Sequence, residues 1–189
     1  IHYKNGPTYF QENELASIIT KDTLDIGFNW LQTDSSRGEL NLETVFIDSN
    51  SFIASSRNSH FTFLDKDWFI ANKGTVKFDK DFFSFHDIEL ATALQNIKVN
   101  GNYGESKEDT LQLEVNNFEL ANFNYMLQQF NYRIAGWSNG YLNWIRKGDM
   151  LKLEAELEID SAAINDYAIG DIMLLSEKTS EDSSYHVKV

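Results

Sequence analysis

Apolar and polar residues alternate along most of this chain, and the alternation restricts it to folds built from half-buried strands. The clearest run is 151–160, with Leu, Leu, Ala, Leu and Ile at the odd positions and Lys, Glu, Glu, Glu and Asp at the even ones. Successive side chains of a strand point to opposite faces of its sheet, so each run predicts one apolar and one polar face. Parallel sheets covered by helices would instead show continuous Val and Ile runs. The chain is therefore predicted to be all-β; shorter runs occupy 24–30, 39–43, 61–63, 75–79, 97–100 and 111–116.

Turn signals rich in Asn and Gly separate these runs and agree with an all-β fold. They are Asn5-Gly6-Pro7, Asn72-Lys73-Gly74, Asn100-Gly101-Asn102, Asn139-Gly140 and Lys147-Gly148-Asp149. The single proline, Pro7, leaves the later strands free to donate their ladder hydrogen bonds. We expect each signal to mark a turn between strands.

One or two short helices are also expected. Residues 11–20 hold Leu15, Ile18 and Ile19 at helical spacing. The stretch 120–130 places Leu120, Phe123, Leu127 and Phe130 on one helical stripe of roughly three turns. Asn117 or Asn122 could cap this second helix, which would plug one end of the sheet core.

Charge and composition exclude several classes of function. The chain has 29 acidic and 16 basic residues, a net charge of -13, which argues against nucleic acid because phosphate binding needs a basic face. The same charge disfavours electrostatic docking onto anionic lipid headgroups, although it leaves apolar contact with lipid tails open. Cysteine is absent, so disulfides and Cys-ligated metals are excluded. No apolar run approaches the ~20 residues of a membrane-spanning helix.

No pattern in the sequence predicts an enzyme, a metal site or a cofactor. His2, His60, His86 and His186 are scattered without a ligand spacing. The two Asp-Lys-Asp triplets, 65–67 and 79–81, lack the glycine and distal glutamate of a calcium loop. Phosphate-binding loops and nucleophile elbows are also missing from the sequence. We therefore expect no catalytic residues.

Aromatic residues on the apolar positions leave two architectures open, because a closed sandwich core and an open apolar trough need the same alternation. Trp137, Tyr141 and Trp144 also lie close together in sequence. They could form a platform that stacks on sugars, but core or cross-strand packing is the commoner role of such residues. The aromatic residues at apolar positions are Phe28, Trp30, Phe61, Phe63, Trp68, Phe78, Phe82, Phe83 and Phe85.

The order of motifs from Leu111 onward resembles the TamB proteins of Gram-negative envelopes, the translocation and assembly module subunits of the AsmA-like group. Repeats of that family carry a strand ending in N-F-x-L, a helical step, L-x-G-x-x-N-G, an alternating strand and G-D-L-x-L. The matching segments are 117–120, 134–140, 151–160 and 170–174, with 68–70, 74–78 and 95–101 similar upstream. Ile replaces the usual Leu in two steps, and Trp137 is bulky for its place.

The resemblance implies an elongated, curved antiparallel or mixed sheet of β-taco type with an apolar concave face. It implies residues 1–189 to be a single fragment of a longer repetitive periplasmic β-domain, with 1–23 as the leading segment and the inner-membrane anchor outside the chain. The implied partners are phospholipid acyl chains and, through other parts of the full protein, an Omp85-type outer-membrane barrel. The implied roles are phospholipid transport between the two membranes and outer-membrane biogenesis.

Alternation and resemblance together predict the wall of a lipid groove. Two other functions stay open: a scaffold that pairs its sheet edge with strands of outer-membrane barrels, and a carbohydrate-binding β-sandwich. The predicted groove residues are Phe61, Phe63, Ile97, Val99, Leu111, Leu113, Val115, Leu151, Leu153, Leu157 and Ile159. No nucleic acid is expected as a partner.

Overall fold

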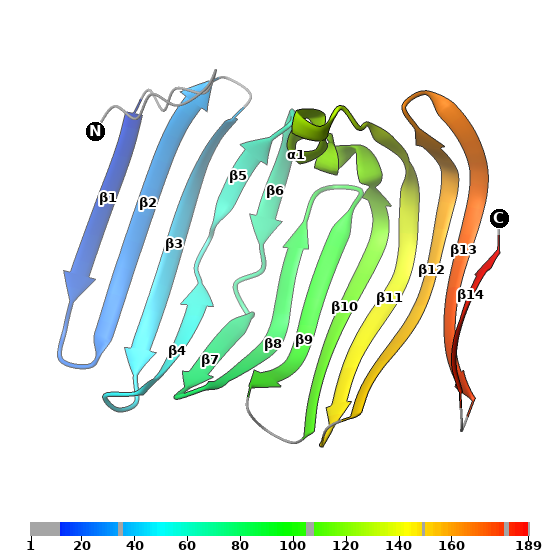
Figure 1. Cartoon of the computed structure of the whole chain (residues 1–189). Helices are drawn as coiled ribbons and strands as arrows, with labels where there is room; N and C mark the ends of the chain where they lie inside the picture. The colour runs from blue at the N-terminus through cyan, green and yellow to red at the C-terminus, as the bar shows by residue number, and fades with distance from the viewer. Residues whose placement is uncertain (1–11, 34–35, 105–107, 149, 180–181, 189) are drawn as a thin grey trace. The chain divides into compact units, whose positions relative to one another are not determined.

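The computed structural model describes residues 12–33, 36–104, 108–148, 150–179 and 182–188 (Figure 1). The described chain is all-β, as the alternation predicted, with one short α-helix flanked by 3-10 turns. It divides into two compact units, residues 1–93 and 94–189, which are described separately below. Within each unit the assigned strand pairings are antiparallel, so the parallel component allowed by a mixed sheet does not occur among them.

The first unit places its strands in the order β1-β2-β3-β4-β7-β8. The short strands β5 and β6 form a hairpin in which β5 pairs with β3 and β6 pairs with β8. The hairpin turns at Leu64 and Asp65, both of which have positive φ, as the two central residues of a type I′ turn require. The strands are β1 (Glu12–Ile19), β2 (Thr23–Thr33), β3 (Ser36–Phe46), β4 (Ser51–Ser56), β5 (His60–Phe63), β6 (Lys66–Ile70), β7 (Thr75–Asp79) and β8 (Phe82–Ala91).

The second unit is a meander in which strands β9 to β14 lie side by side in chain order (Figure 1). Its strands are long, and β12 alone spans 15 residues. Long antiparallel neighbours with short connections are what uninterrupted alternation produces. The strands are β9 (Asn96–Gly104), β10 (Glu108–Glu119), β11 (Ile134–Lys147), β12 (Met150–Ile164), β13 (Tyr167–Thr179) and β14 (Asp182–Lys188).

The prediction of a helix at residues 11–20 is wrong. Residues 12–19 form β1, which pairs with β2 in a continuous register from Glu12 opposite Leu31 to Ile19 opposite Leu24. Leu15, Ile18 and Ile19 remain exposed, so no apolar helical stripe is buried there. A neighbouring strand that offers a full set of backbone partners overrides the weak helical spacing.

The predictions that Asn100-Gly101 and Asn139-Gly140 mark turns are also wrong. Asn100-Gly101 lies inside β9 and Asn139-Gly140 lies inside β11. Gly101 and Gly140 have φ of +121° and +134°, and a Cβ on either would come within 2.0 and 1.9 Å of the carbonyl oxygen of Thr110 and Glu156. Glycine is required at these positions because the neighbouring strand passes too close for any side chain.

Bulges interrupt β10, β11 and β12 near the end of the unit that carries the helical segment. The bulged residue of β10, Asn117, has φ of +50°, and that of β12, Ser161, has φ of +54°. Each bulged amide donates to a side chain of the next strand: Asn117 N–H to Asn139 Oδ1 at 2.7 Å, and Ser161 N–H to Asp171 Oδ1 at 2.8 Å. Bulges bend a strand and increase its twist, and β10 to β12 are visibly bent in Figure 1.

The predicted helix at 120–130 is present as three short pieces: a 3-10 turn (Leu120–Phe123), α1 (Asn124–Leu127) and a second 3-10 turn (Gln128–Phe130). No side chain caps any of them, because Asn117 is occupied at the bulge and the residue before the first turn is Glu119. The segment is fixed by Phe123, whose ring lies 5.4 Å from Phe118, and by Asn124. The Asn124 amide group exchanges two hydrogen bonds with the backbone of Ile134.

Burial is sparse throughout the described residues. Only four apolar side chains among them are buried, namely Trp68, Phe118, Ala155 and Ala162. A sandwich core would bury large side chains from both inner faces. The six strands of the second unit instead form one layer, in which most apolar side chains are half-buried by their neighbours on the same face.

Candidate functional site

The register of the second unit brings its apolar residues together on one face. Directly opposite residues of paired strands lie on the same side of a sheet, so the pairings define rows that cross the strands. One row runs through Ile97, Val115, Gly140, Leu157 and Leu174, and the next through Val99, Leu113, Leu142, Ala155 and Ser176. We name as the aliphatic face Ile97, Val99, Leu111, Leu113, Val115, Leu142, Trp144, Leu151, Leu153, Ala155, Leu157, Ile159, Ile172 and Leu174.

The structure thus places on one face all nine predicted groove residues that belong to this unit. They are Ile97, Val99, Leu111, Leu113, Val115, Leu151, Leu153, Leu157 and Ile159. The predicted Phe61 and Phe63 belong to the first unit and share a different face, described below. Leu142, Trp144, Ile172 and Leu174 were missed, although Leu142-x-Trp144 and Ile172-x-Leu174 carry the same alternation.

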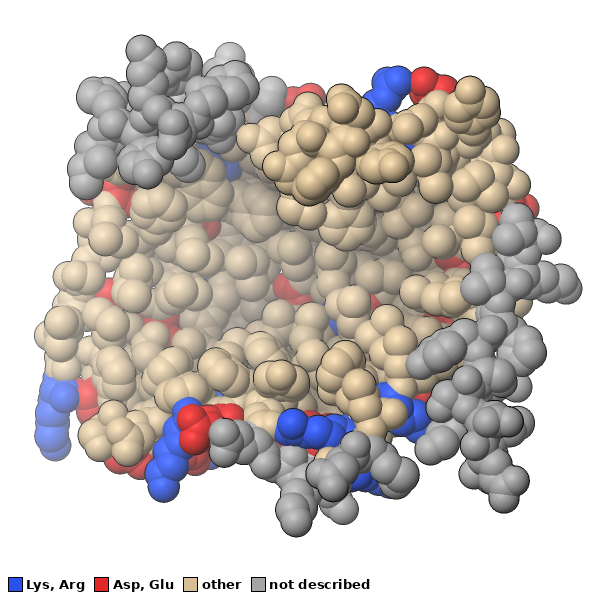
Figure 2. All heavy atoms as spheres, in the orientation of Figure 1, with Lys and Arg blue, Asp and Glu red and all other residues tan. Residues whose placement is uncertain are grey.

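The aliphatic face is open to water. Leu113, near its centre, is 36% exposed, and Leu151 at its edge is 56% exposed. Across β10 to β12, the side of the unit turned toward the viewer in Figure 2 is mostly free of charged atoms, which gather near the hairpin ends at the lower edge. A contiguous, exposed apolar surface of this kind marks an interaction or ligand site in soluble proteins.

The opposite face of the same strands is acidic. Glu154, Glu156, Glu158 and Asp160 alternate with the apolar residues of β12, as the sequence predicted, and Glu114 of β10 lies opposite Lys98 of β9. Lys152 forms an ion pair with Glu154, and the hydrogen bond from this ammonium group holds the pKa of the Glu154 carboxyl below its ordinary value. The charges keep this face in water, so only one side of the sheet can accept an apolar ligand.

The first unit carries an aromatic counterpart, which we name the aromatic face. One row joins Phe46, Phe52, Phe78 and Phe83, with successive ring centroids 6.3, 5.3 and 4.9 Å apart. The full set is Phe28, Trp30, Phe46, Phe52, Phe61, Phe63, Trp68, Phe78, Phe83 and Phe85. Phe82 was grouped with these aromatics from the sequence, but it pairs with Asp79 and therefore lies on the other face.

Gly38 makes room for the predicted groove residue Phe61 on this aromatic face. Gly38 lies opposite both Trp30 and Phe61, and a Cβ on it would come within 2.3 Å of the Trp30 ring and 2.5 Å of Phe61. The Trp30 indole therefore lies over the glycine, 6.2 Å from the Phe61 ring. Because Gly38 has no side chain, the rings of Trp30 and Phe61 can approach each other across β3, which lies between them.

One charged pair interrupts the aliphatic face at its hairpin end. Asp109 lies opposite Arg146, which in turn lies opposite Leu151. Asp109 is 1% exposed, and its Oδ2 accepts hydrogen bonds from the Arg146 guanidinium and from the Gly104 amide. The Arg146 side chain is 31% exposed, with its guanidinium carbon 6.0 Å from the centre of the Tyr103 ring.

The three aromatics proposed as a sugar platform do not share a face. Trp144 lies opposite Leu111 and Leu153 on the aliphatic face. Trp137 lies opposite Asp160, and Tyr141 lies opposite Glu156, both on the acidic face. Their closeness in sequence therefore does not produce one stacking surface, because residues an odd number of positions apart point to opposite sides of a strand.

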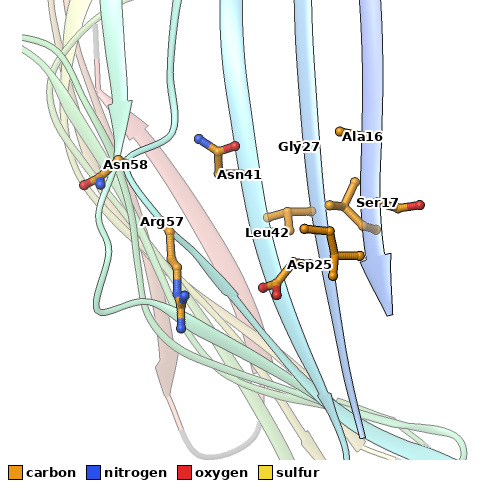
Figure 3. A pocket seen from close by; sticks show the side chains of 10 residues that line it. Ala16, Ser17, Asp25, Gly27, Asn41, Leu42, Arg57 and Asn58 are labelled. Carbon is orange, nitrogen blue, oxygen red and sulfur yellow. The ribbon is translucent and has the colours of Figure 1, made fainter. Parts of the chain in front are cut away.

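Two shallow depressions occur on the polar side of the first unit. The first, of about 300 Å³, lies where Asp25 and Gly27 of β2, Asn41 of β3 and Arg57 meet (Figure 3). Arg57 forms an ion pair with Glu43, and Asn41 exchanges backbone hydrogen bonds with the buried Ser59 hydroxyl, so these polar groups already have partners. The second, of about 480 Å³, is lined by His60, Thr62 and Asp67 among others. Neither contains an arrangement of nucleophile, base and orienting group.

The described residues contain no group of three or more His, Asp or Glu that could hold a metal ion. No helix within those residues is long and apolar enough to span a membrane. Comparison with protein-family models, with curated proteins and with solved structures finds no match to this chain. The two apolar faces are therefore the features from which a function has to be argued.

Proposed function

We propose that this chain is a segment of a TamB-like protein of the Gram-negative periplasm, and that its apolar faces hold phospholipid acyl chains in transit between the inner and outer membranes. The resemblance supplies the family, the compartment, the membrane anchor outside the chain and the Omp85-type partner. The open aliphatic face supports binding of acyl chains independently of the resemblance, whatever lipid carries those chains. The function is passive and involves no bond making or breaking.

The single observation that carries this proposal is the segregation of the second unit into an open aliphatic face and an acidic face. A soluble domain normally covers such rows with a second layer, because exposed apolar area is unfavourable by about 25 cal/mol per Å². Here Leu113, near the centre of the aliphatic face, is 36% exposed to solvent. A surface built this way gains free energy by taking up an apolar ligand from water.

The free energy gained by burying an acyl chain on this face is adequate for reversible binding. Complete burial of one CH₂ group is worth about 0.8 kcal/mol, so a chain of about fifteen carbons lying half against the face would gain on the order of 6 kcal/mol. That gain is enough to hold a chain and small enough to release it, which a conduit requires. Hydrophobic contact lacks direction, so a chain can slide along rows of Leu, Ile and Val without crossing a high barrier.

A pair of adjacent substitutions tests the proposal. Leu113→Asp puts a charge in the centre of the aliphatic face, and Gln112→Asp puts the same charge one residue earlier on the opposite face. We expect Leu113→Asp to abolish photo-crosslinking of a diazirine-labelled phospholipid, because a carboxylate there would have to be desolvated by the acyl chain. Gln112→Asp should crosslink like the unmodified protein.

We expect both variants to fold, because Leu113 is partly exposed and its replacement should be tolerated. Circular dichroism spectra and urea denaturation midpoints check that they do. Equal crosslinking in the two variants would show that the aliphatic face is not the lipid-contacting surface.

A second candidate function, a scaffold for outer-membrane strands, is favoured by the edge strand β1. Among the described strands, β1 pairs with β2 alone, and it leaves Leu15, Ile18 and Ile19 65–77% exposed. An unpaired edge with apolar side chains is a template for strand addition. We expect Leu15→Pro, which removes a backbone donor on the open side of β1, to reduce capture of an unfolded barrel precursor while leaving lipid crosslinking at Leu113 unchanged. Capture that is insensitive to this change excludes β1 as the pairing edge.

A further inference from the structure

In the described strands β9 to β12, the aliphatic face carries two charged side chains, Asp109 and Arg146, and they are directly opposite one another. Their row lies next to the row of Leu111, Trp144 and Leu153. The lysines described on these four strands, Lys98, Lys147 and Lys152, belong to the acidic face. On the neighbouring β13, Lys178 occupies the register position two residues after Ser176. Across β9 to β12, the apolar rows therefore end, at the hairpin end of β11 and β12, on a single guanidinium.

The pair holds Arg146 in place and leaves part of it open. Asp109 is fully buried, and its Oδ2 is shared by the guanidinium and the Gly104 amide. Its Oδ1 is buried without a hydrogen-bond partner, so the contacts of Oδ2 are those that offset the cost of burying Asp109. Arg146 is 31% exposed, and among the described residues Asp109 is the hydrogen-bond acceptor for its guanidinium, so several N–H donors still face solvent.

A half-exposed guanidinium adjoining an apolar surface matches the chemistry of a phosphate group attached to acyl chains. Arginine is the residue suited to phosphate oxygens, because its planar fork of donors binds two of them at once. Asp109 cancels much of the positive charge, so a free phosphate ion should bind weakly. An amphiphile gains the rest of its affinity from contact with the rows of Leu111 and Leu113.

We propose that Arg146, positioned by Asp109, binds the phosphate of an amphiphile whose acyl chains lie on the aliphatic face, so that this hairpin end selects phospholipids over uncharged lipids. The inference rests on the proposed function, because it assumes that acyl chains occupy that face. It adds a polar end to the binding surface and a class of ligand, a phosphate ester with apolar chains.

The test compares two lipids with identical dioleoyl chains, phosphatidylethanolamine and diacylglycerol, by displacement of a fluorescent fatty-acid probe from the whole chain. We expect the phospholipid to bind about tenfold more tightly than the diacylglycerol, the usual worth of one charge-assisted contact. Arg146→Gln should remove this preference and leave diacylglycerol binding unchanged. Lys152→Gln, which removes a cation from the acidic face, should keep the preference.

Arg146→Gln leaves Asp109 buried without its partner and could unfold the hairpin end. The double variant Asp109→Asn and Arg146→Gln replaces the ion pair with an uncharged amide pair, and it should fold and show the same loss of preference. A preference that persists in this folded double variant, or that is absent from the unmodified chain, overturns the inference. Displacement of the phospholipid by inorganic phosphate alone would also overturn it, because the site would then bind free anions.

The two proposals fail in different ways. If neither lipid displaces the probe from the unmodified chain, the proposed function itself is wrong, and the inference falls with it. If both lipids bind with equal affinity, acyl binding stands and only the role of Arg146 is rejected.

Discussion

At the scale of single residues, the motif positions that resemble TamB repeats have backbone roles. Asn117 is a bulge in left-handed conformation, and Asn139 accepts the hydrogen bond of its displaced amide. Asp171 does the same for Ser161 two strands later. A similar contact joins the Asn58 amide, at φ of +51°, to Asn72 Oδ1 in the first unit. Asn and Asp recur at these points because a bulged amide has lost its ladder partner and needs another acceptor.

Gly140 provides a residue-scale prediction. Gly140→Ala should destabilise the second unit by about 3 kcal/mol or more, because it combines an unfavourable positive φ with a clash between its new Cβ and the Glu156 carbonyl. Gly148→Ala is the matched control: its φ is +60°, but a Cβ there would meet nothing within 4 Å. We expect the control to cost only about 1 kcal/mol. Urea denaturation measures both, and equal losses would mean that the close approach is relieved by a backbone shift.

At the scale of elements, the bulges and the helical segment act at the same end of the second unit. The segment between β10 and β11 buries none of its own residues, so helix propensity and packing contribute little to its position. It is held by the contact of Phe123 with Phe118 and by the two hydrogen bonds of Asn124 to the backbone of Ile134. The amide of Asn122 also donates a hydrogen bond to Gln95 Oε1 at 2.9 Å. Phe118 lies on the same side of β10 as the aliphatic face, opposite Ser138. The segment therefore contacts the aliphatic side of β10 at one end of the rows.

We predict that Asn124→Ala releases this segment. Loss of two hydrogen bonds, at 2.8 and 2.9 Å, should cost about 1–3 kcal/mol of local stability. Amide hydrogen exchange of residues 120–132 should accelerate, while exchange in the centre of β12 stays slow. Gln129→Ala, at an exposed position, is a control within the same segment. Unchanged exchange in the Asn124 variant would mean that the Phe123 contact and the Asn122–Gln95 hydrogen bond fix the segment without it.

Comparison of the observed elements with the predicted ones shows which sequence patterns are ambiguous. The run 151–160 was assigned correctly to a strand with its leucines on one face, because period two is unambiguous over ten residues. The run near Leu15 was misassigned, because three apolar residues satisfy a helix and a strand equally well. Asn139-Gly140 was misread as a turn, because the same dipeptide serves a hairpin or a strand position that a neighbouring backbone crowds.

At the scale of the whole molecule, each unit separates apolar from polar side chains without burying a conventional core. The first unit does so with aromatic rings in contact across β3, β4, β7 and β8, and the second with aliphatic residues. A net charge of -13 favours solubility of a chain with exposed apolar surface, because like-charged molecules repel one another. The acidic residues of β12 lie on the face away from the aliphatic rows, so this charge does not oppose an acyl chain there.

The sequence alone determined the all-β class, the two-sided character of the strands and nine residues of the aliphatic face, because these depend only on local periodicity. Tertiary structure decided which strands are neighbours and in what register, and hence that Leu113, Leu142 and Ala155 form one row. It also decided that the rows stay open and end on Asp109 and Arg146, which lie 37 residues apart. Pairing across such distances depends on bulges and close backbone approaches, which leave no periodic trace in the sequence.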